Sequence, residues 1–506
     1  MRRRALLVIM LLVSVLWPSS AQDAPVTEAQ KYIDEIMASE SLRSAQVSVL
    51  AVRLDGEVIA ERESFRKLVP ASNTKLVTTG TALHELGTDF RFETSLAYSG
   101  SIEDGTLHGD LYILGGGDPT LASKDSIATA TDALFQQWRA LLSQAGISRI
   151  EGNIVGDGRY FDGNREEPTW LYEDIGTYYG TGADGLCFYR NIQEFRVSAG
   201  AAVGAPVKVA PSYPQLPWMQ FIYNCSTGIK GSGDKLYLYA TDVAPVAELR
   251  GTYAVDRGPK RLECSNKFGA YTCAWMLRES LATGGIEVSG SAADIDASGK
   301  IRTDPGVPSK GAPSAALRKD MTVLGSTYSP QLHRIAFITN QRSDNFYAEA
   351  MLRILGRTKK GSADYPECIK VEMDALKRMG LDPGKGLSLV DGSGLSRKDL
   401  ASPEFFCSFL KAMLDSPACE AFVNSLPQPG QGTQIARMHG DPAAPRVRYK
   451  SGSMEGVRCY SGYIIPSDGG KEDTIVFSVM VNNYTGSSSR LLSQIDRIIS
   501  LIAKEN

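Results

Sequence analysis

A serine and a lysine stand three residues apart in the stretch LVPASNTKLVTTG, residues 68–80. Three residues make nearly one helical turn, so Ser72 and Lys75 would project from the same face of a helix that begins there. A hydroxyl beside an amine is the arrangement of an activated nucleophile, because the amine can take the proton of the attacking serine. At a helix start, the Ser72 N–H also lies near the positive end of the dipole, where an oxyanion can be held.

The spacing alone does not identify the nucleophile, because four serine–lysine pairs share it: Ser64/Lys67, Ser72/Lys75, Ser232/Lys235 and Ser408/Lys411. Ser232 lies in the glycine loop KGSGDK, Ser408 lies inside an apolar helical run, and Ser64 follows a strand end among charged residues. Only Ser72 has a strand hairpin just before it and an apolar helix, LVTTGTALHEL, directly after it. The context therefore favours Ser72 and Lys75.

Two later motifs could complete such a site. The segment NQRSDNFYAEAMLRILG contains Ser343 and Asn345 at a helix start, and RVRYKSGSMEGV contains Lys450, Ser451 and Gly452 on a predicted strand. Taken alone, the first would be a helix cap and the second an edge strand with a glycine bulge. In the order S-x-x-K, S-D-N, K-S-G, the three motifs favour one shared site over coincidence.

The elements that must position these motifs come from both ends of the chain. Residues 47–63 predict a β-hairpin through Asp55-Gly56, and CYSGYIIPS and TIVFSVMVNNY predict two later strands. A helix over TEAQKYIDEIMA precedes the hairpin, and a helix over LLSQIDRIISLIAK follows the last strand. We therefore predict one antiparallel sheet, built from both termini, with helices against it.

The domain organisation follows from a change of sequence pattern in the middle of the chain, from helical periodicity to short strand-like runs. Residues 96–311 consist of short strand-like runs with glycine turns, and show helical periodicity only near 125–146. We predict a catalytic domain from residues 22–95 and 312–506, interrupted by a β-rich insertion of one or two nested domains.

Composition restricts the class of protein and its partners. The chain has 506 residues, 43% hydrophobic and 22% charged, with a net charge of −3 and no basic cluster interleaved with aromatic residues. These values predict a multidomain globular protein without a nucleic-acid partner. Four histidines without ligand spacing, and no C-x-x-C pair, imply no metal and no organic cofactor. Eight cysteines leave the disulfide pairing open, and Cys264 and Cys273 are the nearest pair.

Residues 1–21 have the form of a secretory signal. A basic start, MRRR, precedes an apolar run of about a dozen residues, ALLVIMLLVSVLW, and then the small residues SSA. We expect cleavage after Ala21 and export across the inner membrane to the periplasm. No later stretch approaches the ~18 uninterrupted apolar residues of a membrane span, so we expect no transmembrane segment after cleavage.

Several segments together resemble one known family. PASNTKLVTT, LYILGGGDPTL, SDNFYAEAMLR, DGSGLSR and YKSGSMEGVRCYSGYI are similar to the D-alanyl-D-alanine carboxypeptidase/endopeptidase branch of the penicillin-binding proteins, the penicillin-binding protein 4 type of peptidase family S13. The resemblance runs from about residue 30 to the C-terminus. It implies an α+β fold with a penicillin-binding/serine β-lactamase-like domain. It also implies cleavage of peptidoglycan stem peptides through a serine acyl-enzyme that β-lactam antibiotics inhibit.

The resemblance implies a role for each catalytic residue. Ser72 would attack the carbonyl, and Lys75 would accept its proton as a neutral amine whose pKa is lowered by burial and by the Lys450 cation. Ser343 would relay a proton toward the leaving amine, and the amide of Asn345 would hold the substrate backbone.

The substrate-binding residues are implied in the same way. Lys450 and Ser451 would face the terminal carboxylate, in a Lys-Ser-Gly motif where relatives usually have threonine at the second position. The N–H groups of Ser72 and Ser453 would form the oxyanion hole, beside Gly452. Asp157 would meet the amine of the third stem-peptide residue, although a turn aspartate explains it equally well.

Two other functions stay open at this point. A secreted serine β-lactamase shares the three motifs, although its usual chain lacks so large an insertion. A non-catalytic wall-binding scaffold could keep the fold, although it would be expected to lose Ser72 or Lys75 first. The sequence ranks neither carboxypeptidase against endopeptidase nor one oligomeric state against another.

Overall fold

The computed structural model describes residues 26–39, 42–295, 299–306, 321–467, 470 and 472–505. The predicted signal, residues 1–21, and the predicted domain boundary at 311/312 lie outside these ranges. Within them, no helix combines the length and apolar character that crossing a membrane requires.

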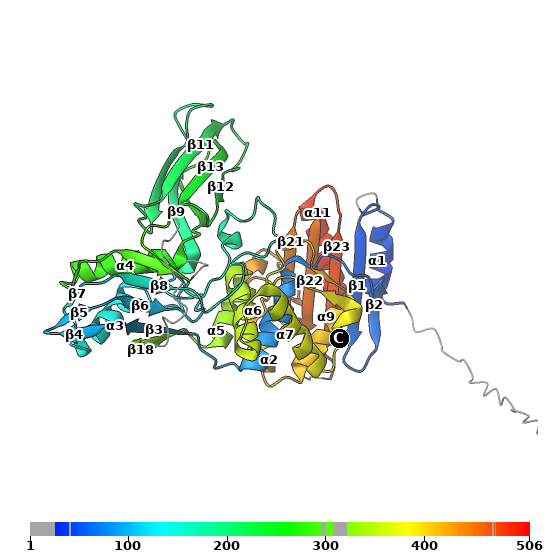
Figure 1. Ribbon diagram of the computed structural model, residues 1–506. Helices are drawn as coiled ribbons and strands as arrows, with labels where there is room; N and C mark the ends of the chain where they lie inside the picture. Colours follow the sequence, from blue (N-terminus) through cyan, green and yellow to red (C-terminus); the bar gives the residue numbers. More distant parts are fainter. Residues whose placement is uncertain are drawn as a thin grey trace, which may run out of the picture.

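A five-stranded antiparallel sheet joins the two ends of the chain in the order β2-β1-β23-β22-β21 (Figure 1). Its strands are β1 (Gln46–Arg53), β2 (Val58–Arg62), β21 (Val447–Met454), β22 (Val457–Ile464) and β23 (Ile475–Asn482). The predicted hairpin is confirmed, because β1 and β2 pair antiparallel across Asp55-Gly56. Strand β1 also pairs with β23 along its whole length, from Gln46 opposite Asn482 to Arg53 opposite Ile475. The shared sheet is therefore built as predicted.

Helices cover both faces of this sheet. One face packs against α1 (Glu28–Met37) and α11 (Ser488–Lys504), the two predicted terminal helices. The apolar stripe of α11 is buried there with the sheet side chains, and its members are Leu491, Ile495, Ile498 and Ile502. The stripe thus serves packing within the protein, where its helical spacing brings all four side chains to one face.

The other face carries the helical layer that positions the three motifs. It contains the 3₁₀ turn η1 (Ala71–Asn73) and the helices α2 (Thr74–Leu86), α5 (Leu332–Arg342), α6 (Asn345–Lys360), α7 (Tyr365–Arg378), α8 (Pro383–Gly386), α9 (Pro403–Leu414) and α10 (Cys419–Ser425). Short elements complete it: β19 (Leu387–Ser388), β20 (Leu400–Ala401) and η4 (Gly432–Gln434). The 3₁₀ turn η5 (Ala444–Arg446) packs on the opposite face, with α1 and α11. Helix α2 is buried from Thr74 to Leu83 and contacts α5, α6, α7 and α10. Its N-terminus is therefore held from several sides.

Two mixed sheets form the first part of the insertion. The six-stranded sheet has the order β17 (Ile301–Arg302), β16 (Ala292–Ile295), β8 (Ile154–Asp157), β6 (Leu111–Leu114), β3 (Glu93–Tyr98) and β18 (Thr322–Tyr328). The four-stranded sheet has the order β15 (Glu287–Val288), β7 (Arg149–Ile150), β5 (Thr106–His108) and β4 (Ser101–Glu103). Helices α3 (Thr131–Gln144) and α4 (Gly269–Thr283) share one hydrophobic core with these two sheets.

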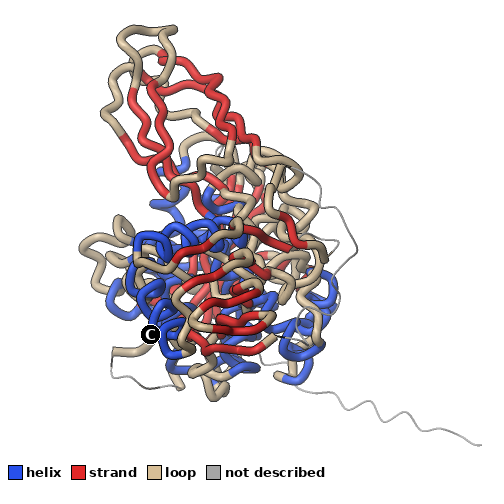
Figure 2. Tube along the Cα trace, turned by 60° about the vertical axis from the view of Figure 1, so that its left-hand side comes forward, coloured by secondary structure: helices blue, strands red, loops and turns tan. Residues whose placement is uncertain are grey.

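Two three-stranded sheets form the second part. One has the order β10 (Lys208–Tyr213), β9 (Ile192–Ser198) and β14 (Lys260–Ser265), and the other β11 (Gln220–Gly228), β13 (Val246–Ala254) and β12 (Tyr237–Ala240). Figures 1 and 2 show these strands projecting from the rest of the molecule. At their base lie the 3₁₀ turns η2 (Tyr178–Gly180), which contacts α6, and η3 (Tyr189–Asn191), whose Arg190 pairs with Asp344 between α5 and α6.

The insertion is rich in strands, and α3 lies in the one region where helical periodicity was found. Helix α4 was not predicted, because its first turns are buried all round and show no polar face. The division into 22–95, 96–311 and 312–506 stays a prediction. The outer strand that pairs with β3, β18, lies beyond residue 311.

Candidate active site

The turn that carries Ser72 is closely packed against two other segments. Ala71 has a φ of 47°, in the left-handed region. A β-carbon at Gly452 would lie 2.3 Å from Pro70 O, and one at Gly394 would lie 1.9 Å from Ala71 O. Glycine at these two positions lets strand β21 and the loop after β19 approach the nucleophile turn.

Gly394→Ala should therefore damage the site. The new β-carbon would clash with the nucleophile turn at a φ of +75°, so we expect a loss of about 1–3 kcal/mol in unfolding free energy. We also expect ~10–100-fold slower acylation by a penicillin, because the clash displaces Ser72. Gly380→Ala is the control, with a φ of +81° and no atom within 4 Å of the position that its β-carbon would take. Equal effects of both variants on acylation would contradict this expectation.

Lys75 is fully buried and has three acceptors within hydrogen-bond distance. Its Nζ lies 3.0 Å from Ser72 Oγ, 2.7 Å from Asn345 Oδ1 and 2.6 Å from Ser393 O. As an ammonium it donates to all three. As a neutral amine at the same 3.0 Å separation, it could instead accept the proton of the Ser72 hydroxyl.

Burial lowers the pKa of Lys75 to about 8. The largest charge effects come from the carboxylates of Asp391 and Glu349, which act in the opposite direction and favour the ammonium. The part of the expectation that rested on burial thus agrees with the structure, whereas Lys450 is not among the main causes. A substantial fraction of neutral amine is available near pH 8.

The second motif forms the tight connection between α5 and α6. Ser343 ends α5 with a φ of 57°, and Asp344 caps α6, with its side chain accepting a hydrogen bond from Tyr347 N at 3.0 Å. The Nδ2 of Asn345 donates to Tyr179 O at 3.1 Å, while its Oδ1 faces the catalytic lysine. Both amide atoms of Asn345 therefore have partners within the protein, and the second proton of Nδ2 is left for the expected contact with a substrate backbone.

The third motif brings a second buried lysine to the site. Lys450 Nζ donates to Ser343 Oγ at 2.8 Å and to Ser451 O at 2.7 Å. Burial lowers the pKa of Lys450, and the charge of Lys75 lowers it further. The Oγ of Ser451 accepts a hydrogen bond from Gln434 Nε2 at 2.7 Å, so its own proton stays available to an anion. Two neighbouring buried lysines disfavour a doubly charged state, which leaves one amine as a base.

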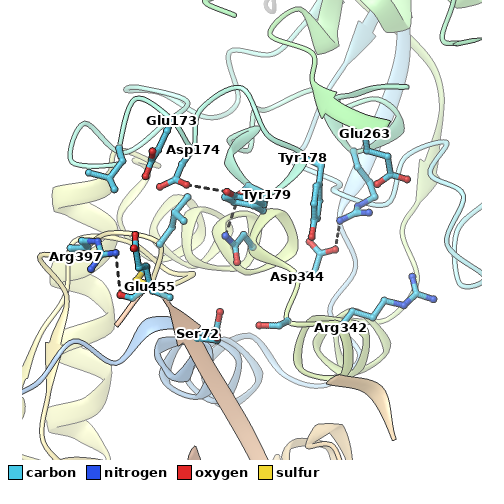
Figure 3. Close-up of a pocket in the computed structure, with 18 residues that line it drawn as sticks. Ser72, Glu173, Asp174, Tyr178, Tyr179, Glu263, Arg342, Asp344, Arg397 and Glu455 are labelled. Atoms are coloured by element: carbon cyan, nitrogen blue, oxygen red, sulfur yellow. Dashed lines mark hydrogen bonds and ion pairs between the residues drawn. The ribbon is translucent and has the colours of Figure 1, made fainter. Parts of the chain in front are cut away.

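A cavity of about 650 Å³ opens over these motifs (Figure 3). Ser72, Ser343, Asn345 and Ser453 line it, while Lys75 and Lys450 lie fully buried behind them. Both signs of charge surround the opening, from Glu173, Asp174, Arg190, Glu263, Arg342, Asp344, Arg397 and Glu455. The cavity thus suits an extended polar ligand that carries charges of its own.

The structure does not bring Asp157 into this cavity. Asp157 is fully buried in β8, where its Oδ1 accepts from Arg159 Nε at 2.9 Å. Among the residues that the structure describes, five other acids line the cavity instead, and one of them, Asp174, accepts from Tyr179 Oη at 3.1 Å and has its pKa raised by burial. Sequence reasoning missed Asp174, because it lies in an irregular segment, WLYEDIGTYYG, with no motif around it.

Two buried carboxylates hold the loop that supplies the third acceptor of Lys75. Glu349 accepts from two backbone N–H groups of this loop at 2.8 and 3.2 Å. Asp391 accepts from two others at 2.6 and 2.8 Å, and from Trp170 Nε1 at 2.8 Å. Burial and the neighbouring Asp391 raise the pKa of Glu349 to about 8. The loop, residues 391–396, is thereby fixed with the Ser393 carbonyl toward the lysine.

The nearest cysteine pair does not form a disulfide, and no metal site is found among the described residues. Cys264 and Cys273 are buried free thiols and are not bonded to each other. Burial raises the pKa of Cys264 to about 12. In the part of the chain that the structure describes, no three His, Cys, Asp or Glu side chains are grouped to hold a metal ion.

The sheet shared by both termini and the Ser–Lys, Ser–Asn and Lys–Ser–Gly constellation define a serine acyl-transfer hydrolase of the penicillin-binding/serine β-lactamase-like class. The solved structure of penicillin binding protein 4 (dacB) from Haemophilus influenzae has the same fold, with a TM-score of 0.74 at 22% identity, covering 94% of this chain and 98% of that one. A second structure of that protein, in complex with a β-lactam, gives a TM-score of 0.70 at 21% identity, covering 94% and 98%. The predicted fold class is confirmed.

The chain belongs to the D-Ala-D-Ala carboxypeptidase 3 (S13) family, whose sequence pattern matches residues 29–504. The D-alanyl-D-alanine carboxypeptidase of Actinomadura sp. (strain R39) is 29% identical over 485 residues, which are 92% of this chain and 83% of the relative. The penicillin-sensitive carboxypeptidase A of Dictyostelium discoideum is 23% identical, over 87% and 83%. The protein is therefore a serine-type D-Ala-D-Ala peptidase, as the resemblance implied, and the β-lactamase alternative is not favoured.

Proposed function

We propose that this peptidase cleaves D-alanyl bonds of peptidoglycan stem peptides with Ser72 as nucleophile and Lys75 as general base. The observation that carries the proposal is the 3.0 Å contact between Ser72 Oγ and Lys75 Nζ at the floor of a cavity, with Ser343 and Lys450 joined at 2.8 Å beside it. Ser72 and Lys75 can form the acyl-enzyme ester, and Ser343 and Lys450 can supply the proton that lets the C–N bond break.

Acylation would proceed with the proton moving from nucleophile to leaving group. Ser72 Oγ attacks the D-alanyl carbonyl while the neutral Lys75 amine takes its proton. The oxyanion accepts hydrogen bonds from the N–H groups of Ser72 and Ser453, where one donor can contribute about 3 kcal/mol. Ser343 passes its hydroxyl proton to the amine of the departing D-alanine as the C–N bond breaks. The proton held by Lys75 then replaces the one that Ser343 gave up, so Lys75 is neutral again.

Deacylation would reuse the same groups. Water attacks the ester carbonyl and gives its proton to Lys75, which has again become neutral. The same N–H groups hold the oxyanion, and Ser72 leaves with a proton to regenerate the free enzyme. Carboxypeptidase and endopeptidase cleavage share this chemistry and differ only in the leaving amine.

Recognition of the substrate would combine one cationic and one mixed-charge region. Lys450 and the free proton of Ser451 are suited to a terminal carboxylate, since both can donate to one anion. At the cavity rim, Asp174 takes the role that was expected of Asp157, because an acid there could pair with an amine on the third stem-peptide residue. Arg397 lines the same cavity and could meet a carboxylate.

We further propose that the protein works outside the cytoplasm, in the periplasm. The support is the pattern of residues 1–21, a basic start followed by a short apolar run and small residues. The mass of the mature N-terminus would test cleavage after Ala21.

The test of the proposed function is a two-part assay on the mature protein. A fluorescent penicillin should increase the intact mass of the protein by that of one penicillin molecule. A model peptide ending in D-Ala-D-Ala should release D-alanine. Labelling without D-alanine release, together with rapid turnover of the penicillin, would instead support a β-lactamase. The absence of both reactions would support a wall-binding protein without catalysis.

A further inference from the structure

The turn η3 at the base of the insertion has an unusual backbone. Tyr189, Arg190 and Asn191 have φ values of 50°, 57° and 51°, and none is glycine. Left-handed backbone is unfavourable for residues with a β-carbon, so a run of three persists only where the surroundings impose it. Such strain clusters at active sites, ligand clamps and switch regions.

The surroundings of the turn do impose this conformation. Tyr189 N donates to Leu121 O at 3.0 Å. Asn191 Oδ1 accepts from Phe188 N at 3.2 Å, and a β-carbon at Gly269 would lie 2.1 Å from that oxygen. The turn is therefore locked to the body of the insertion on both sides of Arg190.

The locked turn aims Arg190 at the second catalytic motif. Its guanidinium forms an ion pair with Asp344, and the two side chains are only 11% and 5% exposed. Its Cζ also lies 5.5 Å from the ring centroid of Tyr347. Figure 3 shows the Asp344 carboxylate joined to a guanidinium group at the far wall of the cavity from Glu173.

The two oxygens of Asp344 have separate tasks. Oδ1 accepts from Tyr347 N and caps α6, which is sufficient for the helix. Oδ2 pairs with Arg190, a residue of the insertion. The second oxygen therefore serves a link between domains that helix capping does not require.

Asp344 stands between the two residues of the motif that touch the buried lysines. Ser343 Oγ accepts from Lys450, and Asn345 Oδ1 accepts from Lys75. The insertion also holds Asn345 directly, because its Nδ2 donates to Tyr179 O. An anchor on Asp344 consequently fixes the positions of both hydrogen bonds to the lysines.

We propose that the insertion acts on catalysis through Arg190, a positioning residue whose ion pair with Asp344 holds the Ser343–Asn345 turn in the geometry needed for acylation. This rests on the proposed function, in which Ser343 and Asn345 act on Lys450 and Lys75. The insertion is then part of the active site's framework as well as a projecting module.

The experiment is a double-mutant cycle on penicillin acylation. Arg190→Gln, Asp344→Asn and the double variant are titrated with a fluorescent penicillin, which separates its dissociation constant from the first-order acylation rate constant. Asp344→Asn keeps a capping oxygen and loses the charge. We expect each single variant to lower the acylation rate constant about tenfold or more with little change in the dissociation constant, and the double variant to lose no more than either single one.

The matched control is Arg302→Gln. Arg302 pairs with Asp294 in the insertion, with side chains 18% and 6% exposed, away from the second motif. It should lower thermal stability comparably and leave the acylation rate constant unchanged. Arg190→Lys, which keeps the charge, should recover part of the rate that Arg190→Gln loses.

Three outcomes would overturn the inference: wild-type acylation in Arg190→Gln, an equal rate loss in Arg302→Gln, or additive losses in the double variant. If Arg190→Gln does not fold, Asp344→Asn decides alone, since a wild-type acylation rate there is equally contrary. Failure of the wild-type protein to label would refute the proposed function itself, a result distinct from an unaffected Arg190 variant.

Discussion

Ser72→Ala should abolish covalent labelling by a penicillin and slow D-alanine release by about 10⁴–10⁶-fold, because removal of a nucleophile removes the acyl-enzyme pathway entirely. The substitution deletes one oxygen from a partly buried side chain, so it should leave the fold intact. Intact mass after incubation with the penicillin measures the first effect directly, and the release of D-alanine measures the second.

Ser408→Ala is the matched control for this prediction. Ser408 stands three residues before Lys411, as Ser72 stands before Lys75, but it is exposed on α9. It should label at the wild-type rate. Labelling that persisted in Ser72→Ala would mean that another of the four serine–lysine pairs supplies the nucleophile.

The shared sheet and the three motifs could be predicted because their signals are local. Asp55-Gly56 determines a turn, the apolar stripe of α11 determines a buried face, and an S-x-x-K pair at a helix start needs only one helical turn to bring both groups together. The joining of both termini in one antiparallel sheet was also predicted, and β1 and β23 make that connection. The order of the strands was not predicted.

The rest depended on contacts between segments far apart in the sequence. Asp157 ends strand β8, where Arg159 occupies its carboxylate, whereas Asp174 lies in an irregular segment. Only the cavity, which segments far apart in the sequence line together, shows that Asp174 reaches the site and Asp157 does not. The link from Arg190 to Asp344 spans 154 residues and has no motif on the insertion side. The hydrogen bond from Asn345 to Tyr179 could not be predicted either, since its acceptor is a backbone carbonyl, which any residue type supplies.

Acylation should also depend on pH in the way that a buried lysine base requires. The pKa of Lys75 is lowered to about 8, and the neutral amine is the active form. Well below pH 8, the fraction of neutral Lys75 amine rises about tenfold per pH unit, and above pH 8 nearly all of the amine is neutral. The acylation rate constant should therefore rise in the same way and level off above pH 8. Pre-steady-state labelling between about pH 6 and 9 gives this profile.

Lys75→Arg separates the base from its surroundings. Arginine keeps a positive charge and stays protonated across this range, so the rate should fall by about 10²–10⁴-fold and the rise near pH 8 should disappear. Glu349 has a pKa raised to about 8 as well, and it is untouched in this variant. A pH dependence that survived in Lys75→Arg would therefore belong to another group, such as Glu349 with its hold on the 391–396 loop or Lys450, whose pKa burial lowers. Lys411→Met changes the lysine of the exposed serine–lysine pair, whose Nζ donates to Leu54 O and does not line the cavity. This variant should therefore keep both the acylation rate constant and its pH profile.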